Sequence, residues 1–224
     1  NAVRLRVWVD PKEHDNWCNT ADLVTKAKRA AELGMDVMVD FHYSDWWADP
    51  GKQHKPAAWK GRNLADLKKA VAGHTADVLN ALKAAGVTPK WVQVGNEIRS
   101  GILWDEYAAL SGASYDVREC DVKGSNSTSE EVKYRENFAN LAAFINVGYD
   151  AVKSVFDDAI VIVHLDNGYD NELYTWFFDE LRANGGKWDM IGMSLYPYWT
   201  MLEHKEYTAD RTITECIANI NSVA

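Results

Sequence analysis

The sequence predicts an α/β fold built on a parallel sheet. Apolar, strand-like segments alternate along the chain with segments of helical periodicity. Polar and aromatic residues gather directly after several of these strands, where a parallel sheet has its functional edge. Both observations favour strands joined by right-handed helical crossovers. The 224 residues are enough to bury a sizeable core, in one domain or two small ones.

The first strand and helix are predicted within residues 3–33. Residues 3–9 are rich in β-branched and aromatic side chains, and Arg4 and Arg6 interrupt them on one face. Two arginines that point the same way from a buried strand need carboxylate partners, unless the strand is an edge with a solvated face. A helix follows from a cap at Asn19 or Thr20.

The next strand, residues 37–43, leads into a long polar and aromatic loop over 44–61. A loop of this length in a compact domain is usually functional. A second helix is predicted from about residue 63 to residue 85. It carries His74 on its apolar face, which favours a structural histidine over a ligand.

A short strand over residues 91–98 ends in Asn96 and Glu97. Strand alternation would place Gln93 and Glu97 on one face and Asn96 on the other. Glutamate is a poor strand former and is almost never fully buried without a partner. A carboxyl at the carboxyl end of a buried strand is typical of barrel enzymes, whereas a loop-edge glutamate that caps the next element is the alternative.

The second half of the chain repeats the alternation after a stretch with little periodicity, residues 105–128. A capping box of Thr128 and Glu131 predicts the start of a long helix. Residues 159–165 are continuously apolar, as in a strand buried on both faces. A further strand is predicted over 188–195, and a second capping box, Thr212 with Glu215, predicts the last helix.

A barrel explains this pattern better than a doubly wound open sheet. The first strand is followed by Val9-Asp10-Pro11, which is not the glycine-rich loop that binds a dinucleotide. The net charge of −9 also argues against nucleic acid or an anionic membrane as a partner, and the sequence contains no apolar run long enough to span a membrane. Three cysteines at unrelated spacings predict neither a disulfide framework nor a metal site.

Ten tryptophans are many for this length, and several stand beside glycine, proline, aspartate or histidine rather than in apolar runs. Flat aromatic faces near polar groups suit the C–H faces of sugar rings, although tryptophan also fills protein cores. The polar segments after the strands are VRLRVWVDP (3–11), DFHYSDWWADPGKQHKPAAW (40–59), VQVGNEI (92–98), HLDNG (164–168) and SLYPYW (194–199). Together they resemble the endo-β-1,4-galactanases of glycoside hydrolase family 53 over essentially the whole chain, apart from about 105–130.

The resemblance implies a (β/α)8 TIM barrel that cleaves β-1,4-galactan, a side chain of pectic arabinogalactan, with retention of configuration. It implies that Glu97 is the general acid/base and that Asn96 holds the hydroxyl next to the reacting carbon. Arg6 is implied to lie beneath the site and support the nucleophile. The other residues implied to bind substrate are His42, Asp45, Trp47, Trp59, His164, Asp166, Tyr196 and Trp199.

Counted against the family, the chain covers about strands 2 to 6 of the barrel. Retaining hydrolysis needs a second carboxyl about 5–5.5 Å from the first, and in the family it is a glutamate after strand seven. Glu203 and Glu206 fall in the loop after strand six, and Glu215 belongs to the predicted cap, so we expect none of them to replace it. Residues 1–224 are therefore expected to be an incomplete catalytic barrel domain, inactive alone.

Three other functions are compatible with the sequence. A related barrel hydrolase of mannan, xylan or glucan would share the Asn-Glu pair, and a non-catalytic galactan-binding relative would keep the aromatic surfaces. A metal-dependent hydrolase would use the histidines and aspartates at strand ends, Asp40, His42, His164 and Asp166. We expect no cofactor and no metal, a polysaccharide as the partner, and secretion or a periplasmic or cell-surface location, because the polymer does not enter cells intact.

Overall fold

The computed structural model describes residues 1–104 and 128–224, which form a five-stranded parallel sheet with helices packed against it. The strands lie side by side in chain order and every neighbouring pair is parallel, so the predicted parallel sheet is confirmed. A strictly sequential order lacks the point at which a doubly wound sheet reverses direction. The strands are β1 (Ala2–Val7), β2 (Asp36–Phe41), β3 (Trp91–Val94), β4 (Ile160–Leu165) and β5 (Met190–Met193).

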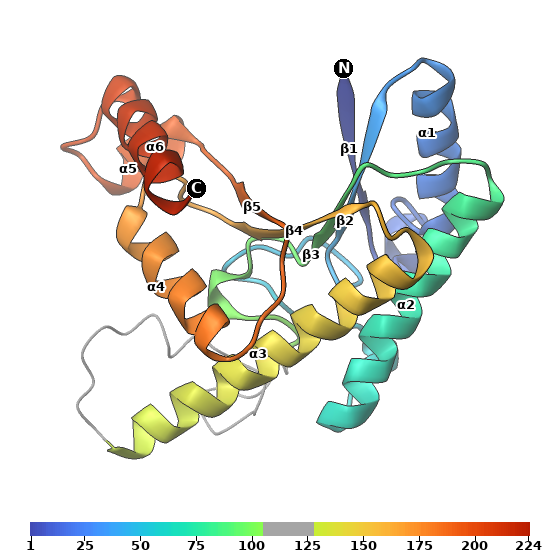
Figure 1. The fold of residues 1–224 in the computed structure, drawn as a ribbon, viewed down its shortest axis with the longest axis horizontal. Helices are drawn as coiled ribbons and strands as arrows, with labels where there is room; N and C mark the ends of the chain where they lie inside the picture. Colours follow the sequence, from blue (N-terminus) through green and yellow to red (C-terminus); the bar gives the residue numbers. More distant parts are fainter. Residues whose placement is uncertain (105–127) are drawn as a thin grey trace.

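The helices follow the outside of the curved sheet, with the last two beyond β5 (Figure 1). Helices α2 and α3 are the longest of the described part and pack against each other. No helix in the described ranges is long and apolar enough to cross a membrane. The helices are α1 (Thr20–Glu32), α2 (Leu64–Ala84), α3 (Thr128–Val155), α4 (Asn171–Ala183), α5 (Pro197–Glu203) and α6 (Ala209–Val223), with 3-10 turns η1 (Lys12–His14), η2 (Ala57–Trp59) and η3 (Ile98–Ser100).

Side-chain caps set the beginnings of several helices. The side chain of Asn19 accepts a hydrogen bond from the Asp22 N–H, and Asn63 does the same for Asp66, so α1 and α2 begin where the sequence predicts. The stretch 105–127 and the side chains of the capping box predicted at Thr128 and Glu131 lie outside the described residues.

The second predicted capping box is wrong. Thr208, not Thr212, caps α6, because its extended backbone lets its hydroxyl oxygen accept the N–H of Arg211. The helix therefore begins at Ala209, and Thr212 lies inside it with its hydroxyl donating to the Thr208 carbonyl. The Glu215 carboxylate accepts hydrogen bonds from Tyr207 and Arg211 instead of closing a cap.

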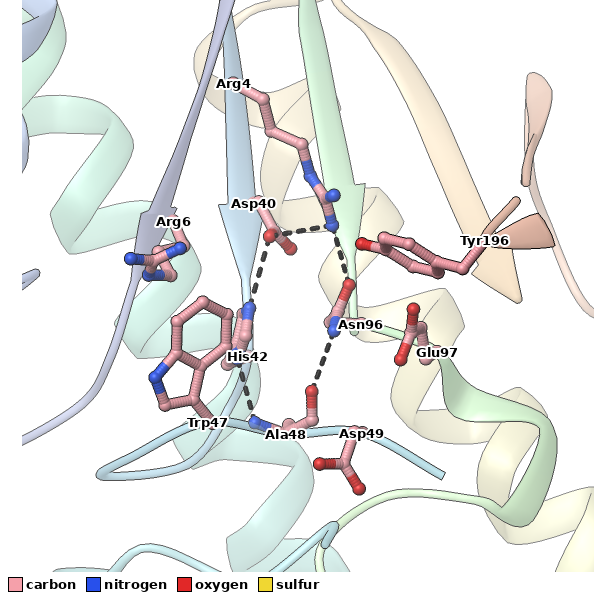
Figure 2. Close-up of a pocket in the computed structure, with 10 residues that line it drawn as sticks. All are labelled: Arg4, Arg6, Asp40, His42, Trp47, Ala48, Asp49, Asn96, Glu97 and Tyr196. Atoms are coloured by element: carbon pink, nitrogen blue, oxygen red, sulfur yellow. Dashed lines mark hydrogen bonds and ion pairs between the residues drawn. The ribbon is translucent and has the colours of Figure 1, made fainter. Parts of the chain in front are cut away.

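The strands separate an apolar face from a polar one. Val39, Val94 and Val163 are fully buried in the core between sheet and helices. Each such side chain stabilises the fold by about 1.5–3 kcal/mol. Because side chains alternate along a strand, the intervening positions of β1 and β2, such as Arg4 and Asp40, face the opposite side of the sheet, where they meet in a pocket (Figure 2). The sheet thereby carries polar groups to its concave side.

Close packing of α3 on β3 fixes the strand that leads to Asn96 and Glu97. A Cβ atom on Gly148 of α3 would lie 2.7 Å from Val94 Cγ1 and 3.1 Å from the Tyr43 hydroxyl. No side chain fits there without displacing β3 or its neighbours, so glycine sets the distance between helix and sheet.

We therefore expect Gly148→Ala to lower the free energy of unfolding by about 1–3 kcal/mol, the usual cost of overpacking, in spite of alanine's higher helix propensity. Gly73→Ala in α2 is the matched control, because a Cβ there meets nothing within 4 Å. It should raise the free energy of unfolding by about 0.5–1 kcal/mol. Urea unfolding of the full-length protein measures both, and equal stabilisation by the two substitutions would contradict the close contact.

Candidate active site

An open polar pocket of about 350 Å³ lies at the carboxyl ends of the strands (Figure 2). Six of the residues that the resemblance implied to be catalytic or substrate-binding line it. They come from segments at or after the ends of β1, β2, β3 and β5. These six are Arg6, His42, Trp47, Asn96, Glu97 and Tyr196, and the other lining residues are Arg4, Asp40, Ala48 and Asp49.

Asn96 and Glu97 both face the pocket, whereas strand alternation predicted opposite faces. That prediction is wrong because β3 ends at Val94. The chain then turns through Gly95 at φ 86° and Glu97 at φ 51°, and the 3-10 turn η3 begins at Ile98. A Cβ on Gly95 would lie 2.6 Å from Ile98 Cγ2, so this tight turn requires glycine. A left-handed conformation is uncommon for glutamate.

The Asn96 amide is held in one orientation by three partners. Its Oδ1 accepts hydrogen bonds from Arg4 Nη2 at 2.6 Å and from Gln93 Nε2 at 3.2 Å, and its Nδ2 donates to the Ala48 carbonyl at 2.7 Å. The Gln53 side chain, which is buried, donates to the Asn96 backbone carbonyl at 2.7 Å. The long loop after β2 therefore packs against the end of β3, and its residues Ala48 and Gln53 hold Asn96 in place.

The buried carboxylate of Asp40 has three donor groups around it. Arg4 Nη2 lies 2.9 Å from its Oδ2, His42 Nε2 lies 3.2 Å from the same oxygen, and Gln93 Nε2 donates to its Oδ1 at 2.6 Å. Burial alone would raise the pKa of Asp40, but the hydrogen bond from His42 and the charge of Arg4 outweigh it, and the pKa lies below its ordinary value. The prediction that an arginine of the first strand has a carboxylate partner is confirmed for Arg4.

The pKa of Glu97 is shifted in the opposite direction. Burial raises it most, and the nearby Asp49 carboxylate raises it further. A hydrogen bond with Ser194 and the charges of Arg4 and His42 lower it, without cancelling the effect of burial. A carboxyl with a raised pKa beside open solvent is suited to give up a proton during a reaction near neutral pH.

His164 lies behind Glu97 and does not line the pocket. Its Nδ1 accepts the Glu97 backbone N–H at 3.2 Å, and its Nε2 lies 3.0 Å from Ser194 Oγ. The ring is 4% exposed, and burial, with the charge of Arg4, lowers its pKa to about 3. His164 is therefore neutral at ordinary pH.

Asp45, Asp166 and Trp199 also lie outside the residues that line the pocket. Asp45 accepts the N–H groups of Asp10 and Ala57 at 2.9 and 2.8 Å, so it ties two loops together. Asp166 forms an ion pair with Arg99 at 3.2 Å. Trp199 is 57% exposed on α5, next to Tyr198.

The expectation that Trp59 offers a stacking surface does not hold. The resemblance implied a stacking surface there, but the side chain is 5% exposed and belongs to the apolar core, with its ring edge against His74. The 3-10 turn η2, in which Trp59 is the last residue, turns this side chain inward toward α2. It has no open face for a sugar.

The placement of Arg6 differs from the expectation that both arginines of the first strand pair with carboxylates. The Arg6 guanidinium lies over the Trp47 ring at 3.8 Å from its centroid, and the neighbouring Arg4 makes the contacts with Asn96 and Asp40. Sequence analysis also did not select Asp49, Gln53 or Ser194 for the site. Among the described residues no three histidines, cysteines or carboxylates are gathered as for a metal ion.

Comparison with known proteins gives the family. The model of glycosyl hydrolase family 53 matches residues 1–219, nearly the whole chain. The chain belongs to glycosyl hydrolase family 53. A protein of Niallia circulans described as an uncharacterized protein in the bgaB 5′ region is 42% identical over 89% of this chain and 49% of its own length. An arabinogalactan endo-β-1,4-galactanase of Thermothelomyces thermophilus is 34% identical over 89% of this chain and 53% of its own length.

Solved structures of family 53 share the fold. A fungal β-1,4-galactanase superimposes with a TM-score of 0.77 at 28% identity, over 99% of this chain and 57% of that one. The family 53 catalytic domain of Ignisphaera aggregans gives a TM-score of 0.72 at 33% identity, over 89% and 49%. These relatives are (β/α)8 barrels, and the five parallel strands correspond to part of such a barrel. The chain spans about half the length of the curated relatives it matches.

The Asp40 network makes a prediction for the stability of this family 53 chain. Asp40→Asn should lower the free energy of unfolding by about 3 kcal/mol at pH 7, because Arg4 and His42 lose a charged partner in a buried place. Asp36→Asn on the same strand is the control, because its ion pair with Lys90 is exposed, and exposed pairs contribute about 0–1 kcal/mol.

The pH dependence follows from the lowered pKa of Asp40. The carboxylate stabilises the fold fully above the pKa of an unfolded aspartate, about 3.9, and this stabilisation is lost as the pH falls through the lower folded-state pKa. The difference between wild type and Asp40→Asn should therefore shrink below pH 4. Urea unfolding at several pH values measures it, and an equal effect of both substitutions would contradict the role of Asp40.

Proposed function

We propose that the chain is part of the catalytic barrel of a retaining endo-β-1,4-galactanase that acts on pectic arabinogalactan. The observation that carries the proposal is the placement of Glu97, a partly buried carboxyl with a raised pKa, beside the fixed amide of Asn96 in an open polar pocket. Membership in family 53 and relatives named as arabinogalactan endo-β-1,4-galactanases support the substrate class.

Glu97 is proposed to act first as an acid and then as a base. Protonated at the start, it gives its proton to the glycosidic oxygen as that bond breaks, while a second carboxylate attacks the anomeric carbon. A covalent glycosyl-enzyme results. The ionised Glu97 then takes a proton from the water that releases the sugar, which restores both carboxyl groups.

The other partners of the reaction are assigned in the same way. The nucleophile is proposed to be a glutamate carried by a further strand of the barrel, outside the 224 residues. Asn96, held between Arg4 and the Ala48 carbonyl, is proposed to bind the hydroxyl next to the reacting carbon. Such a contact strengthens in the transition state and stabilises it more than the bound substrate.

Three exposed aromatic residues near the pocket are proposed to stack on galactose units. Trp47 is 41% exposed, Tyr196 is 58% exposed and Trp199 is 57% exposed. Arg6 over the Trp47 ring holds that indole in place through a cation–π contact. Because the polymer is too large to enter a cell, we also propose that the enzyme acts outside the cytoplasm.

Glu97→Gln in the full-length protein tests the assignment. It should lower kcat on galactan by about 10²–10⁴-fold, the usual contribution of general acid–base catalysis, while galactan binding stays close to wild type. The control is Glu203→Gln, which changes an exposed glutamate at the end of α5 and should leave kcat unchanged. Near-normal turnover by Glu97→Gln would contradict the role of Glu97, and faster wild-type cleavage of xylan or mannan than of galactan would contradict the substrate.

A further inference from the structure

The backbone of Glu97 is hydrogen-bonded on two sides by buried side chains from other segments. Gln53 Nε2, in the loop after β2, donates to the carbonyl oxygens of Asn96 at 2.7 Å and of Glu97 at 3.3 Å. His164 Nδ1, near the end of β4, accepts the Glu97 N–H at 3.2 Å. We call the side chains of Gln53 and His164 the Glu97 clamp.

The left-handed conformation of Glu97 allows one donor group to meet two consecutive carbonyls. In an extended strand successive carbonyls point in opposite directions, whereas in a helical conformation of either hand they point nearly the same way. With Glu97 at φ 51° and ψ 53°, the carbonyls of Asn96 and Glu97 both reach the Gln53 amide. An extended backbone at Glu97 would turn the two carbonyls apart and break this arrangement.

Main-chain hydrogen bonds carry the Gln53 amide to this place. The Trp104 N–H donates to the Gln53 carbonyl at 2.6 Å, and the Lys55 N–H donates to the Trp104 carbonyl at 3.0 Å. The Trp104 indole in turn donates to the Ser100 carbonyl at 2.9 Å. The loop is thereby paired with the segment that follows Glu97, and the Gln53 side chain is only 1% exposed. Its amide has no water to bond instead of the two carbonyls.

The imidazole of His164 is fixed in the form that accepts. A backbone N–H can only donate, so Nδ1 carries no proton and the neutral ring has its proton on Nε2. Nε2 lies 3.0 Å from Ser194 Oγ, which accepts that proton's hydrogen bond. A Cβ at Gly192 would lie 3.1 Å from His164 Cδ2, so glycine there leaves the space that the ring occupies.

We infer that Gln53 is a positioning residue for Glu97 and that His164 is its counterpart on the other side of the turn. Bonds to both carbonyls and to the N–H hold Glu97 in a conformation that costs free energy for a residue with a Cβ. The Glu97 clamp thereby sets the direction in which the carboxyl enters the pocket. Neither clamp side chain lines the pocket, so both act through the backbone. The inference rests on the proposed function only in taking Glu97 to be the acid/base.

Gln53→Met in the full-length protein removes the donor and keeps a side chain of similar length. On galactan, whose leaving group needs a proton, kcat/KM should fall by about 10–10²-fold, the cost of a small misplacement of a catalytic group. On an activated aryl galactobioside, whose leaving group needs no acid, kcat/KM should stay close to wild type, because it reports formation of the glycosyl-enzyme. Gln53→Leu is a second variant without a donor and should show the same difference between the substrates.

Thr75→Val is the matched control for a buried hydrogen bond lost elsewhere. Thr75 is fully buried on α2, and its hydroxyl bonds to the Tyr43 hydroxyl and to the Val71 carbonyl, both at 2.8 Å. Any loss of activity through stability alone should be equal on the two substrates. Equal losses on both substrates in the Gln53 variants, or no loss on galactan, would overturn the proposal.

His164→Leu and His164→Asn test the other side of the turn. The amide oxygen of asparagine is as many bonds from the backbone as the imidazole Nδ1, so it can accept the Glu97 N–H, whereas leucine offers no acceptor. His164→Leu should show the selective loss on galactan, and His164→Asn should recover part of it. A loss that His164→Asn does not reduce would overturn the part assigned to His164.

Hydrogen exchange measured by NMR tests the Glu97 clamp without any assay of activity. The Glu97 amide should exchange about 5-fold faster in Gln53→Met, as expected when one hydrogen bond's net contribution is lost. The Gly95 amide is the internal control, because it donates to the Phe41 carbonyl at 3.1 Å and does not depend on the clamp. Unchanged exchange at Glu97 would overturn the proposal. If Glu97 exchange rises as expected but wild-type protein cleaves no galactan, the clamp stands and the proposed function fails.

Discussion

The ion pair between Arg4 and Asp40 is the interaction on which the pocket depends. Arg4 comes from β1, Asp40 from β2, and the same guanidinium reaches Asn96 after β3, so one side chain joins three neighbouring strands (Figure 2). A carboxylate as buried as Asp40 stays ionised only because these donors surround it. The orientation of the Asn96 amide follows from that charge, since Arg4 is held in place by Asp40.

Two carboxyl groups in one pocket are shifted in opposite directions. Asp40 is surrounded by donors and its pKa is lowered, whereas Glu97 has fewer donors, is partly buried beside Asp49, and its pKa is raised. Environments that separate two carboxyl groups in this way divide their tasks. Asp40 keeps a permanent negative charge that organises the site, and Glu97 is left able to exchange a proton.

The sequence predicted the features that depend on local pattern. Caps at Asn19 and Asn63 need only the residues that follow them, and both helices begin there. Glu97 became a candidate because glutamate is out of place at the end of a buried strand, and its role as the acid/base was implied by the resemblance alone. The start of α6 was mispredicted because Thr208 and Thr212 are both suitable caps, and only the extended backbone of Thr208 decides between them.

Features that depend on tertiary packing could not be predicted. Alternation along β3 failed at Asn96 and Glu97 because period two holds only as far as the strand does. Arg6 is opposite Asp40 in the register of β1 and β2, yet its guanidinium lies over Trp47 and Arg4 makes the ion pair. The burial of Trp59 and the contact of His164 with Ser194 depend on which segments pack together. The local sequence pattern does not contain that information.

The measurement that tests the central claim most directly is azide rescue of Glu97→Ala in the full-length protein, with an activated aryl galactobioside as substrate. Such a substrate needs no acid to leave, so the glycosyl-enzyme forms, and azide then replaces the water that Glu97 would have activated. If Glu97 is the acid/base of a retaining enzyme, azide restores turnover and the product is the β-galactobiosyl azide. An α-configured azide would make Glu97 the nucleophile instead, and no rescue together with normal turnover on galactan would remove it from the chemistry.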